Sequence, residues 1–382
     1  MKKLVALLLL AVIAFPSFSE ASAIKSIKIT ETTPVFDEKQ KVAVFQKGTS
    51  HTVMKESDLY YYTVIGNDEV KFSKKKGKVT KEQPESWKGA HPVRAKTSTY
   101  VQIVDRPTKN ATIVGQIQPN MTIQVQRLKG DYFPIIMGGK TGYIHKNQLH
   151  IQAGIPVLMY HDILRTKTDD NTSTLEIEKF KKQMDYLKNN GWTTITPQQL
   201  EQWVAKKTTL PKKSVLITFD DGYQSTIDLA YPILKAHGFQ ATSFLITSRI
   251  NRPNTVSELG MIQTQDVFSY QSHTHAFHMF NSQTNTSLLQ HETESAIFHD
   301  LEQANSSIEE ILGYNYRVTT LAYPYGKRGP EAISALQSVG LTSAYTIDEG
   351  NVFQGDPLFE LKRQRVHSSM TLQNFADKLE GK

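Results

Sequence analysis

The chain has 382 residues, room for two or three domains, and carries a formal net charge of +7 with no cysteine. The missing cysteine excludes a disulfide framework and a lipid-modified cysteine anchor. Charge is uneven: residues 24–150 hold 21 Lys and Arg against 11 Asp and Glu, whereas residues 151–382 hold 21 against 25. The basic character therefore belongs to the front half alone.

The first 23 residues have the composition of a secretory signal peptide. A basic start precedes an apolar run at residues 4–15, and Ala21-Ser22-Ala23 supplies the small residues found at cleavage sites. The apolar run is shorter than the ~20 residues that a membrane-spanning helix needs. We therefore expect a secreted protein, extracellular or associated with the cell wall, without a transmembrane anchor.

Residues 24–150 contain short β-rich runs separated by turn residues. A weak internal repeat divides them, since TTPVFDEKQKVAVFQKG from Thr32 is echoed by TYVQIVDRPTKNATIVGQIQPN from Thr99. The Lys-rich run at residues 74–78 has no interleaved aromatic residues of the kind that single-stranded nucleic acid requires. We expect no nucleic-acid partner, and an anionic cell wall is the expected counter-surface for the positive charge.

The second copy, residues 91–150, resembles a bacterial SH3-like module, and GKTGYIHKNQL at residues 139–149 matches the closing strands of that family. The first copy, residues 24–90, is a looser match. The resemblance implies two small all-β barrels that attach the protein to the cell wall. The alternative is that both copies are only spacers.

From residue 155 onward the pattern changes to strands that alternate with helices. The predicted helices cover residues 175–190, 197–207, 226–237, 294–312 and 331–339. The predicted strands between them include VLMYH, VLITF, ATSFLI, TTLAY and SAYTI. This order predicts an α/β domain of parallel strands joined by right-handed crossovers.

The stretch VLITFDDGY, residues 215–223, brings two adjacent carboxylates to the end of a buried strand. Neighbouring side chains on an extended backbone point apart, so Asp220 and Asp221 cannot share one role, and Gly222 allows a sharp turn. One carboxylate can hold a metal while the other handles a proton. Taken alone, the pattern fits equally well a strand end whose Asp caps the following helix.

A second stretch, SHTHAFH at residues 272–278, favours the metal interpretation. On a helix of ~100° per residue, His273 and His278 would point about 140° apart, so both can reach one ion only from a loop. Two His and one carboxylate leave a coordination position open for water, which is typical of catalytic sites. We expect His275 to be a surface or core residue.

These stretches resemble the motifs of a known family. TFDDGY, SHTHAFH and AYPYG (residues 322–326) look like the first three motifs of the NodB-homology polysaccharide deacetylases, carbohydrate esterase family 4. The opening IPVLMYHDIL, residues 155–164, is similar to the branch that includes the poly-N-acetylglucosamine deacetylases. For the domain that we place at residues 151–382, the resemblance implies a distorted (β/α) barrel with functional residues at the C-terminal ends of its strands.

The resemblance also completes a mechanism. The expected ligands of a divalent metal, zinc first with cobalt or nickel as alternatives, are Asp221, His273 and His278. Asp220 would accept a proton from the water that attacks an N-acetyl carbonyl. His161 would protonate the departing amine, and the backbone N–H of Tyr325 would stabilise the oxyanion.

Two departures from the general family pattern concern the groups around the catalytic acid. Ala322 stands where the third motif usually has an Arg that tunes the catalytic Asp, and the Trp of the fourth motif is missing from residues 345–351. Both absences also occur in the branch with the MYH opening. His367 receives no role.

Two classes of function remain open. The first is a secreted, metal-dependent deacetylase of an N-acetylated polysaccharide, with peptidoglycan favoured over poly-β-1,6-N-acetylglucosamine. The second is a cell-wall-binding protein whose deacetylase-like domain is inactive. The intact Asp-Asp-Gly and paired His favour the first class, because an inactive copy has no chemical need to keep all four groups.

Overall fold

A computed structural model describes residues 25–83, 93–166 and 171–381, which belong to two compact units. The predicted signal peptide lies outside the described residues. Within the described part of the chain, no helix is long and apolar enough to cross a membrane. Of the described residues, one unit holds 25–83, 99–121 and 134–145, and the other holds 93–98, 122–133, 146–166 and 171–381.

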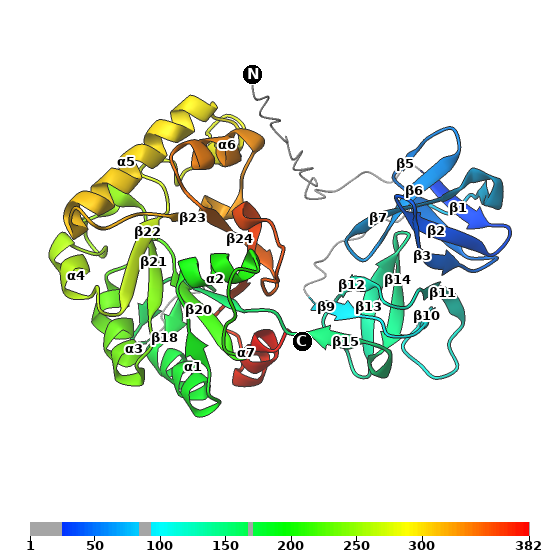
Figure 1. The fold of residues 1–382 in the computed structure, drawn as a ribbon, viewed down its shortest axis with the longest axis horizontal. Helices are drawn as coiled ribbons and strands as arrows, with labels where there is room; N and C mark the ends of the chain where they lie inside the picture. The colour runs from blue at the N-terminus through cyan, green and yellow to red at the C-terminus, as the bar shows by residue number, and fades with distance from the viewer. Residues whose placement is uncertain (1–24, 84–92, 167–170, 382) are drawn as a thin grey trace, which may run out of the picture. The chain divides into compact units, whose positions relative to one another are not determined.

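The front half is all β, and eight of its strands close into a ring because β13 pairs with both β14 and β6 (Figure 1). In ring order the strands are β13 (Tyr132–Met137), β14 (Lys140–His145), β10 (Val101–Val104), β11 (Ile113–Ile117), β3 (Gln40–Phe45), β2 (Thr33–Asp37), β7 (Asp68–Ser73) and β6 (Tyr60–Ile65), with β5 (Lys55–Glu56) beside β6. Alternate residues of these strands, such as Val35, Phe72 and Ile103, are fully buried inside the ring.

The internal repeat of the sequence reappears in this ring. The first copy supplies two pairs, β2 with β3 and β6 with β7, and the second copy supplies β10 with β11 and β13 with β14. Each copy adds a three-stranded sheet, β4-β1-β8 or β12-β9-β15. Their strands are β1 (Lys25–Ile29), β4 (Ser50–Val53), β8 (Gly77–Val79), β9 (Val93–Lys96), β12 (Thr122–Val125) and β15 (His150–Gln152).

The pairing of strands between the copies differs from the prediction of two separate small barrels. Strand β3 pairs with β11, and β6 with β13, so strands of both copies share one ring. An all-β front half with a closed barrel is thus confirmed. The SH3-like identity stays a prediction, as do the boundaries after residues 90 and 150.

The rest of the chain forms the β/α barrel that the sequence predicts. Seven parallel strands close a ring because β16 pairs with both β20 and β25. The strands are β16 (Val157–Tyr160), β20 (Ser214–Phe219), β21 (Ala241–Leu245), β22 (Phe268–Ser272), β23 (Thr320–Ala322), β24 (Ser343–Glu349) and β25 (Leu361–Arg365), with β19 (Thr193–Thr194) beside β20 and a short pair β17 (Ile163–Leu164) and β18 (Leu175–Glu176) outside the ring.

Helices surround the barrel strands (Figure 1). They are α1 (Ile177–Asn189), α2 (Pro197–Val204), α3 (Tyr231–His237), α4 (Glu258–Gln263), α5 (Glu294–Leu312), α6 (Pro330–Ser338) and α7 (Leu372–Leu379). All six residues of β20 are buried, since one face meets the barrel interior and the other meets the helices. Such a strand is a rigid support for the two carboxylates that follow it.

Candidate active site

The two carboxylates after β20 point to different partners, as their adjacency predicts. Asp221 has φ 72° and Gly222 also has φ 72°, so the chain turns sharply through the left-handed region. A Cβ on Gly222 would meet the Leu245 side chain at 2.9 Å, which is a second reason for glycine there. The turn sends Asp220 toward β25 and Asp221 toward the histidine loop.

Asp221, His273 and His278 come together as a possible metal-binding triad. One ligand atom from each lies within 4.8 Å of the others. The Nε2 atoms of His273 and His278 lie 3.5 and 3.2 Å from Asp221 Oδ1. Burial alone would raise the pKa of Asp221, but the neighbouring imidazoles of His273 and His278 outweigh that effect and hold the pKa far below its ordinary value.

The surroundings of His273 prepare it as a metal ligand. His273 follows β22 directly, and its Nδ1 lies 2.6 Å from the Ala322 carbonyl oxygen. A carbonyl oxygen only accepts, so Nδ1 carries the hydrogen and the Nε2 lone pair is free for a metal ion. Two imidazoles and a carboxylate, so oriented, fit a divalent ion with an open coordination position.

A buried arginine that the sequence analysis missed holds Asp220. The Arg363 side chain from β25 is fully buried, and it donates two hydrogen bonds of 2.7 Å to the Asp220 carboxylate. Burial alone would raise the pKa of Asp220, but the charge and hydrogen bonds of Arg363 lower it below its ordinary value. Asp220 is therefore held ionised, as a proton acceptor must be.

The signal that could have revealed Arg363 was indirect. Ala322 leaves the usual arginine position of the third motif empty, so another cation has to compensate the buried Asp220. Arg363 lies 143 residues further along the chain, in the run LKRQR, which has several basic residues and no motif. Only the pairing of β25 with β16, next to β20, brings it to the site.

A second missed residue, Asp300 on α5, anchors the histidine loop. Its carboxylate is buried and accepts hydrogen bonds from the backbone N–H groups of His275 and Ala276, at 2.9 and 2.7 Å. The His275 side chain lies apart from the triad, with Nδ1 2.9 Å from the Thr247 hydroxyl. These contacts fix the loop that ends at His278.

Tyr325 lies in a tight turn, Pro324–Gly326, beside the triad. Its φ of 57° is in the left-handed region. Its ring centroid is 4.6 Å from that of His278, and its hydroxyl is 3.2 Å from His278 Nδ1. The turn therefore places the Tyr325 side chain against His278, and the oxyanion role of the Tyr325 backbone N–H stays a prediction.

His161 follows β16 and is half-buried close to the same charges. Its Nδ1 atom is buried without a hydrogen-bond partner among the described residues. Burial lowers the pKa of His161, and the nearby charges of Asp220 and Asp221 only partly oppose that effect. His367 contacts Ser369, with 2.8 Å between Nδ1 and the hydroxyl, and gains no role.

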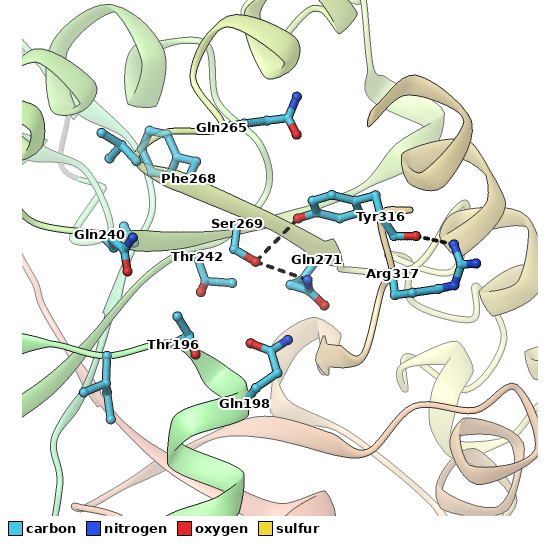
Figure 2. Close-up of a pocket in the computed structure, with 13 residues that line it drawn as sticks. Thr196, Gln198, Gln240, Thr242, Gln265, Phe268, Ser269, Gln271, Tyr316 and Arg317 are labelled. Carbon is cyan, nitrogen blue, oxygen red and sulfur yellow. Dashed lines mark hydrogen bonds between the residues drawn. The ribbon is translucent and has the colours of Figure 1, made fainter. Parts of the chain in front are cut away.

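A separate pocket lies away from these groups, at the N-terminal ends of the barrel strands (Figure 2). Its lining includes Thr242 and Ser269, near the starts of β21 and β22, and the side chain of Gln271. Ser269 Oγ accepts a hydrogen bond from Gln271 Nε2 at 3.2 Å, and lies 3.4 Å from the Tyr316 hydroxyl. None of the predicted site residues lines this pocket.

A known protein family matches the segment that carries the triad. Residues 207–344, which include Asp220, both triad histidines and the Tyr325 turn, match the family described as polysaccharide deacetylase. The matched segment covers strands β20, β21, β22 and β23 of the barrel. The enzyme class that these findings support is polysaccharide N-deacetylase.

Two relatives in sequence are informative. The chain is 29% identical over 220 residues to the putative polysaccharide deacetylase YxkH of Bacillus subtilis, which covers 57% of this chain and 74% of that protein. It is 29% identical over 180 residues to a poly-beta-1,6-N-acetyl-D-glucosamine N-deacetylase of Staphylococcus aureus. That match covers 45% of this chain and only 60% of the staphylococcal protein.

Two solved structures share the deacetylase fold. IcaB from Ammonifex degensii has a TM-score of 0.53 at 25% identity, over 60% of this chain and 96% of that chain. The Streptococcus pyogenes deacetylase PplD, in complex with acetate, has a TM-score of 0.54 at 23% identity, over 59% of this chain and 98% of that chain. Deacetylases thus have the barrel fold that positions the site described above.

Proposed function

We propose that this protein is a secreted, metal-dependent hydrolase that removes N-acetyl groups from N-acetylglucosamine residues of an extracellular polysaccharide. The observation that carries the proposal is the pairing of an ionised, Arg-held Asp220 with the Asp221-His273-His278 triad. Proton transfer and metal binding are thus assigned to two adjacent residues, Asp220 and Asp221. The basic front half would attach the enzyme to the cell wall.

Each residue has a distinct task in this proposal. Asp221, His273 and His278 would hold the divalent ion, which when bound polarises the acetyl carbonyl and makes water more acidic. Asp220 takes the proton of the attacking water, and Arg363 keeps Asp220 ionised beforehand.

The remaining two groups act on the substrate side. The backbone N–H of Tyr325 would donate to the oxyanion that forms on the acetyl carbonyl. His161 would deliver a proton to the departing amine. Because burial lowers the pKa of His161, proton delivery is expected to be strongest in the acidic part of the pH profile.

The comparisons change the order of the two candidate substrates. The wall-binding interpretation of the front half favours peptidoglycan, whereas the staphylococcal relative is named for poly-β-1,6-N-acetylglucosamine. Since the relative matches the catalytic barrel, we place poly-β-1,6-N-acetylglucosamine first and peptidoglycan second. Zinc is the proposed ion, because two imidazoles and one carboxylate form a common zinc ligand set.

The test is to incubate the purified protein, loaded with zinc, with each polymer and to measure acetate and free amines released. We expect release from poly-β-1,6-N-acetylglucosamine, and a rate at least about 10²-fold lower in an Asp220→Asn variant. Release from neither polymer, with metal bound and small aryl acetates untouched, would favour the inactive wall-binding alternative.

A further inference from the structure

Aromatic rings run from the metal-binding triad to the protein surface. The ring centroids of His273 and His278 are 4.8 Å apart, those of His278 and Tyr325 are 4.6 Å apart, and those of Tyr325 and Phe280 are 4.3 Å apart. Tyr325 is thus the only ring between Phe280 and a triad histidine in this row. Phe280 is 43% exposed, so the row ends in an open aromatic face.

The loop that carries Phe280 is held by its own hydrogen bonds. Phe280 forms an antiparallel bridge with Ser287, and the Asn281 N–H donates to the Thr286 carbonyl at 2.7 Å. The Asn281 side-chain oxygen accepts from the N–H groups of Gln283 and Thr284, at 2.9 and 3.1 Å. The exposed ring is therefore presented by an ordered hairpin.

A second exposed apolar side chain borders the same turn. Ile347 is 43% exposed, and a Cβ on Gly326 would meet Ile347 Cγ1 at 2.4 Å. The turn that carries Tyr325 thus has Phe280 against its ring and Ile347 against its glycine. Exposed apolar groups gathered next to a polar catalytic site are typical of a ligand-binding surface.

The chemistry of this surface fits a pyranose ring. A β-linked hexosamine has a face of C–H groups, which are weakly positive, and an aromatic ring has a negative face. Phe280 offers no hydrogen bond and no charge, so it would bind the sugar by its C–H face and not by its substituents.

We propose that Phe280, which with Ile347 flanks the Tyr325 turn, is the platform for the sugar unit next to the one being deacetylated, so that the enzyme prefers chains over single sugars. This inference rests on the proposed function, because it requires a glycan at the triad.

The experiment compares Phe280→Ala, Phe280→Trp and Tyr314→Ala with the wild type, all as zinc-loaded full-length protein. The substrates are a β-1,6-linked N-acetylglucosamine pentamer and nitrophenyl acetate, which has no sugar. Tyr314 is the matched control, because it is 89% exposed and follows α5, at the opposite end of the barrel from the triad.

We expect Phe280→Ala to raise KM for the pentamer about tenfold, the order of one aromatic contact, and to lower the pentamer-to-ester ratio of kcat/KM accordingly. Phe280→Trp should restore the ratio, and Tyr314→Ala should leave it unchanged. Equal loss on both substrates would overturn the inference, because Phe280 would then only support Tyr325. An unchanged KM in Phe280→Ala, with active wild type, would overturn it and leave the proposed function intact. A wild type that cleaves the ester but not the pentamer would overturn the inference and leave peptidoglycan as the remaining substrate of the proposed function.

Discussion

At the scale of single residues, the site depends on a buried ion pair whose two members come from distant parts of the chain. Asp220 is 2% exposed and Arg363 is fully buried. Removing one member of a buried pair leaves the other charge uncompensated, which typically costs about 3–5 kcal/mol. The pair therefore links the stability of the barrel to the ionisation of the proposed base.

Replacing Arg363 with Met should move the acid limb of the activity profile. Arg363 lowers the pKa of Asp220, so its loss lets burial raise that pKa, and a base with a higher pKa is protonated up to a higher pH. We expect deacetylation at neutral pH to fall and the rising limb to shift upward. The measurement is kcat/KM against pH, with circular dichroism to confirm folding.

Arg365→Met is the matched control, since Arg365 lies on the same strand but is exposed and bonds to Ser173. A rising limb at the same pH in Arg363→Met and in the wild type would contradict the tuning role.

A buried histidine in the front barrel should make that barrel sensitive to acid. His51 is buried and its ring stacks on Phe45, with centroids 3.7 Å apart. Burial lowers its pKa to about 3. Between that value and its unfolded pKa of ~6.5, only the unfolded chain binds the proton, so stability is complete above ~6.5 and falls by up to about 1.4 kcal/mol per pH unit below it.

Calorimetry of thermal unfolding at pH 7 and pH 4.5 tests this expectation. His51→Phe keeps an aromatic ring but cannot titrate, so its front-barrel transition should lose less stability in acid than that of the wild type. His150→Phe, at an exposed position, should behave like the wild type. Equal acid losses in wild type and His51→Phe would show that His51 is not the cause.

Candidate residues in short sequence motifs could be identified from the sequence, whereas residues that act through distant partners were missed. Asp220, Asp221, His273 and His278 stand in two compact motifs, and the structure brings Asp221, His273 and His278 together. Arg363 and Asp300 act through partners far away in the sequence, 143 and about 25 residues distant. Their identity as site residues depends on strand pairing and helix packing, which residue spacing does not express.

At the scale of elements, the histidine loop is positioned by α5. The helix begins with Thr293, whose side chain accepts from the Ala296 N–H, and α5 spans Glu294–Leu312 as the sequence predicts. Asp300 on this helix accepts the two backbone hydrogen bonds that hold the loop. The geometry of the triad therefore depends on the docking of one helix.

Asp300→Ala should weaken metal binding without removing any ligand. Two buried N–H groups would lose their acceptor and the loop to His278 would loosen, so we expect zinc affinity to fall about 10- to 100-fold, as for other groups that orient metal ligands. Competition with a zinc-binding dye measures this directly. Glu302→Ala, at an exposed position on the same helix, should retain full affinity. Unchanged zinc affinity in folded Asp300→Ala would contradict the positioning role.

Helix starts were predicted better than some helix interiors. Helix α2 starts at Pro197 as predicted, and a capping box that the sequence analysis did not predict forms around Thr196. The single helix predicted at 226–237 is instead a π-helical turn, Thr226–Ala230, followed by α3. Pro232 lies near the junction, and its missing N–H cannot continue an ordinary hydrogen-bond ladder. Periodicity alone does not distinguish these two arrangements.

At the scale of the whole molecule, strand content and fold class followed from the sequence, but strand pairing in the front half did not. The repeat predicted two similar β segments, and both are present. Turn residues show where strands end, yet they do not show which strand lies beside which, because neighbours across β3–β11 are about 70 residues apart. In the β/α half, the alternation of strands and helices predicted parallel strands with right-handed crossovers, and the family resemblance supplied the closure into a barrel.

The positive charge of the front half should carry wall binding in the full-length protein. Reversing three exposed lysines of that half, Lys39, Lys41 and Lys78, to Glu should reduce sedimentation with purified cell walls. Wild-type binding should also weaken with salt, because exposed charges are screened over ~8 Å at physiological ionic strength. The matched control reverses Lys182, Lys207 and Lys212, which are exposed on the catalytic half. Equal loss in both triple variants would mean that the front half has no special part in wall binding.

The proposed function requires a metal held by Asp221, His273 and His278, and it requires Asp220 to accept the proton of the attacking water. The most direct measurement is zinc content and acetate release, determined in parallel for wild type, His278→Ala and Asp220→Asn with poly-β-1,6-N-acetylglucosamine. We predict that His278→Ala loses both metal and activity, whereas Asp220→Asn keeps the metal and loses at least about 10²-fold in rate. Full zinc occupancy in His278→Ala, or wild-type rates in Asp220→Asn, would contradict the account.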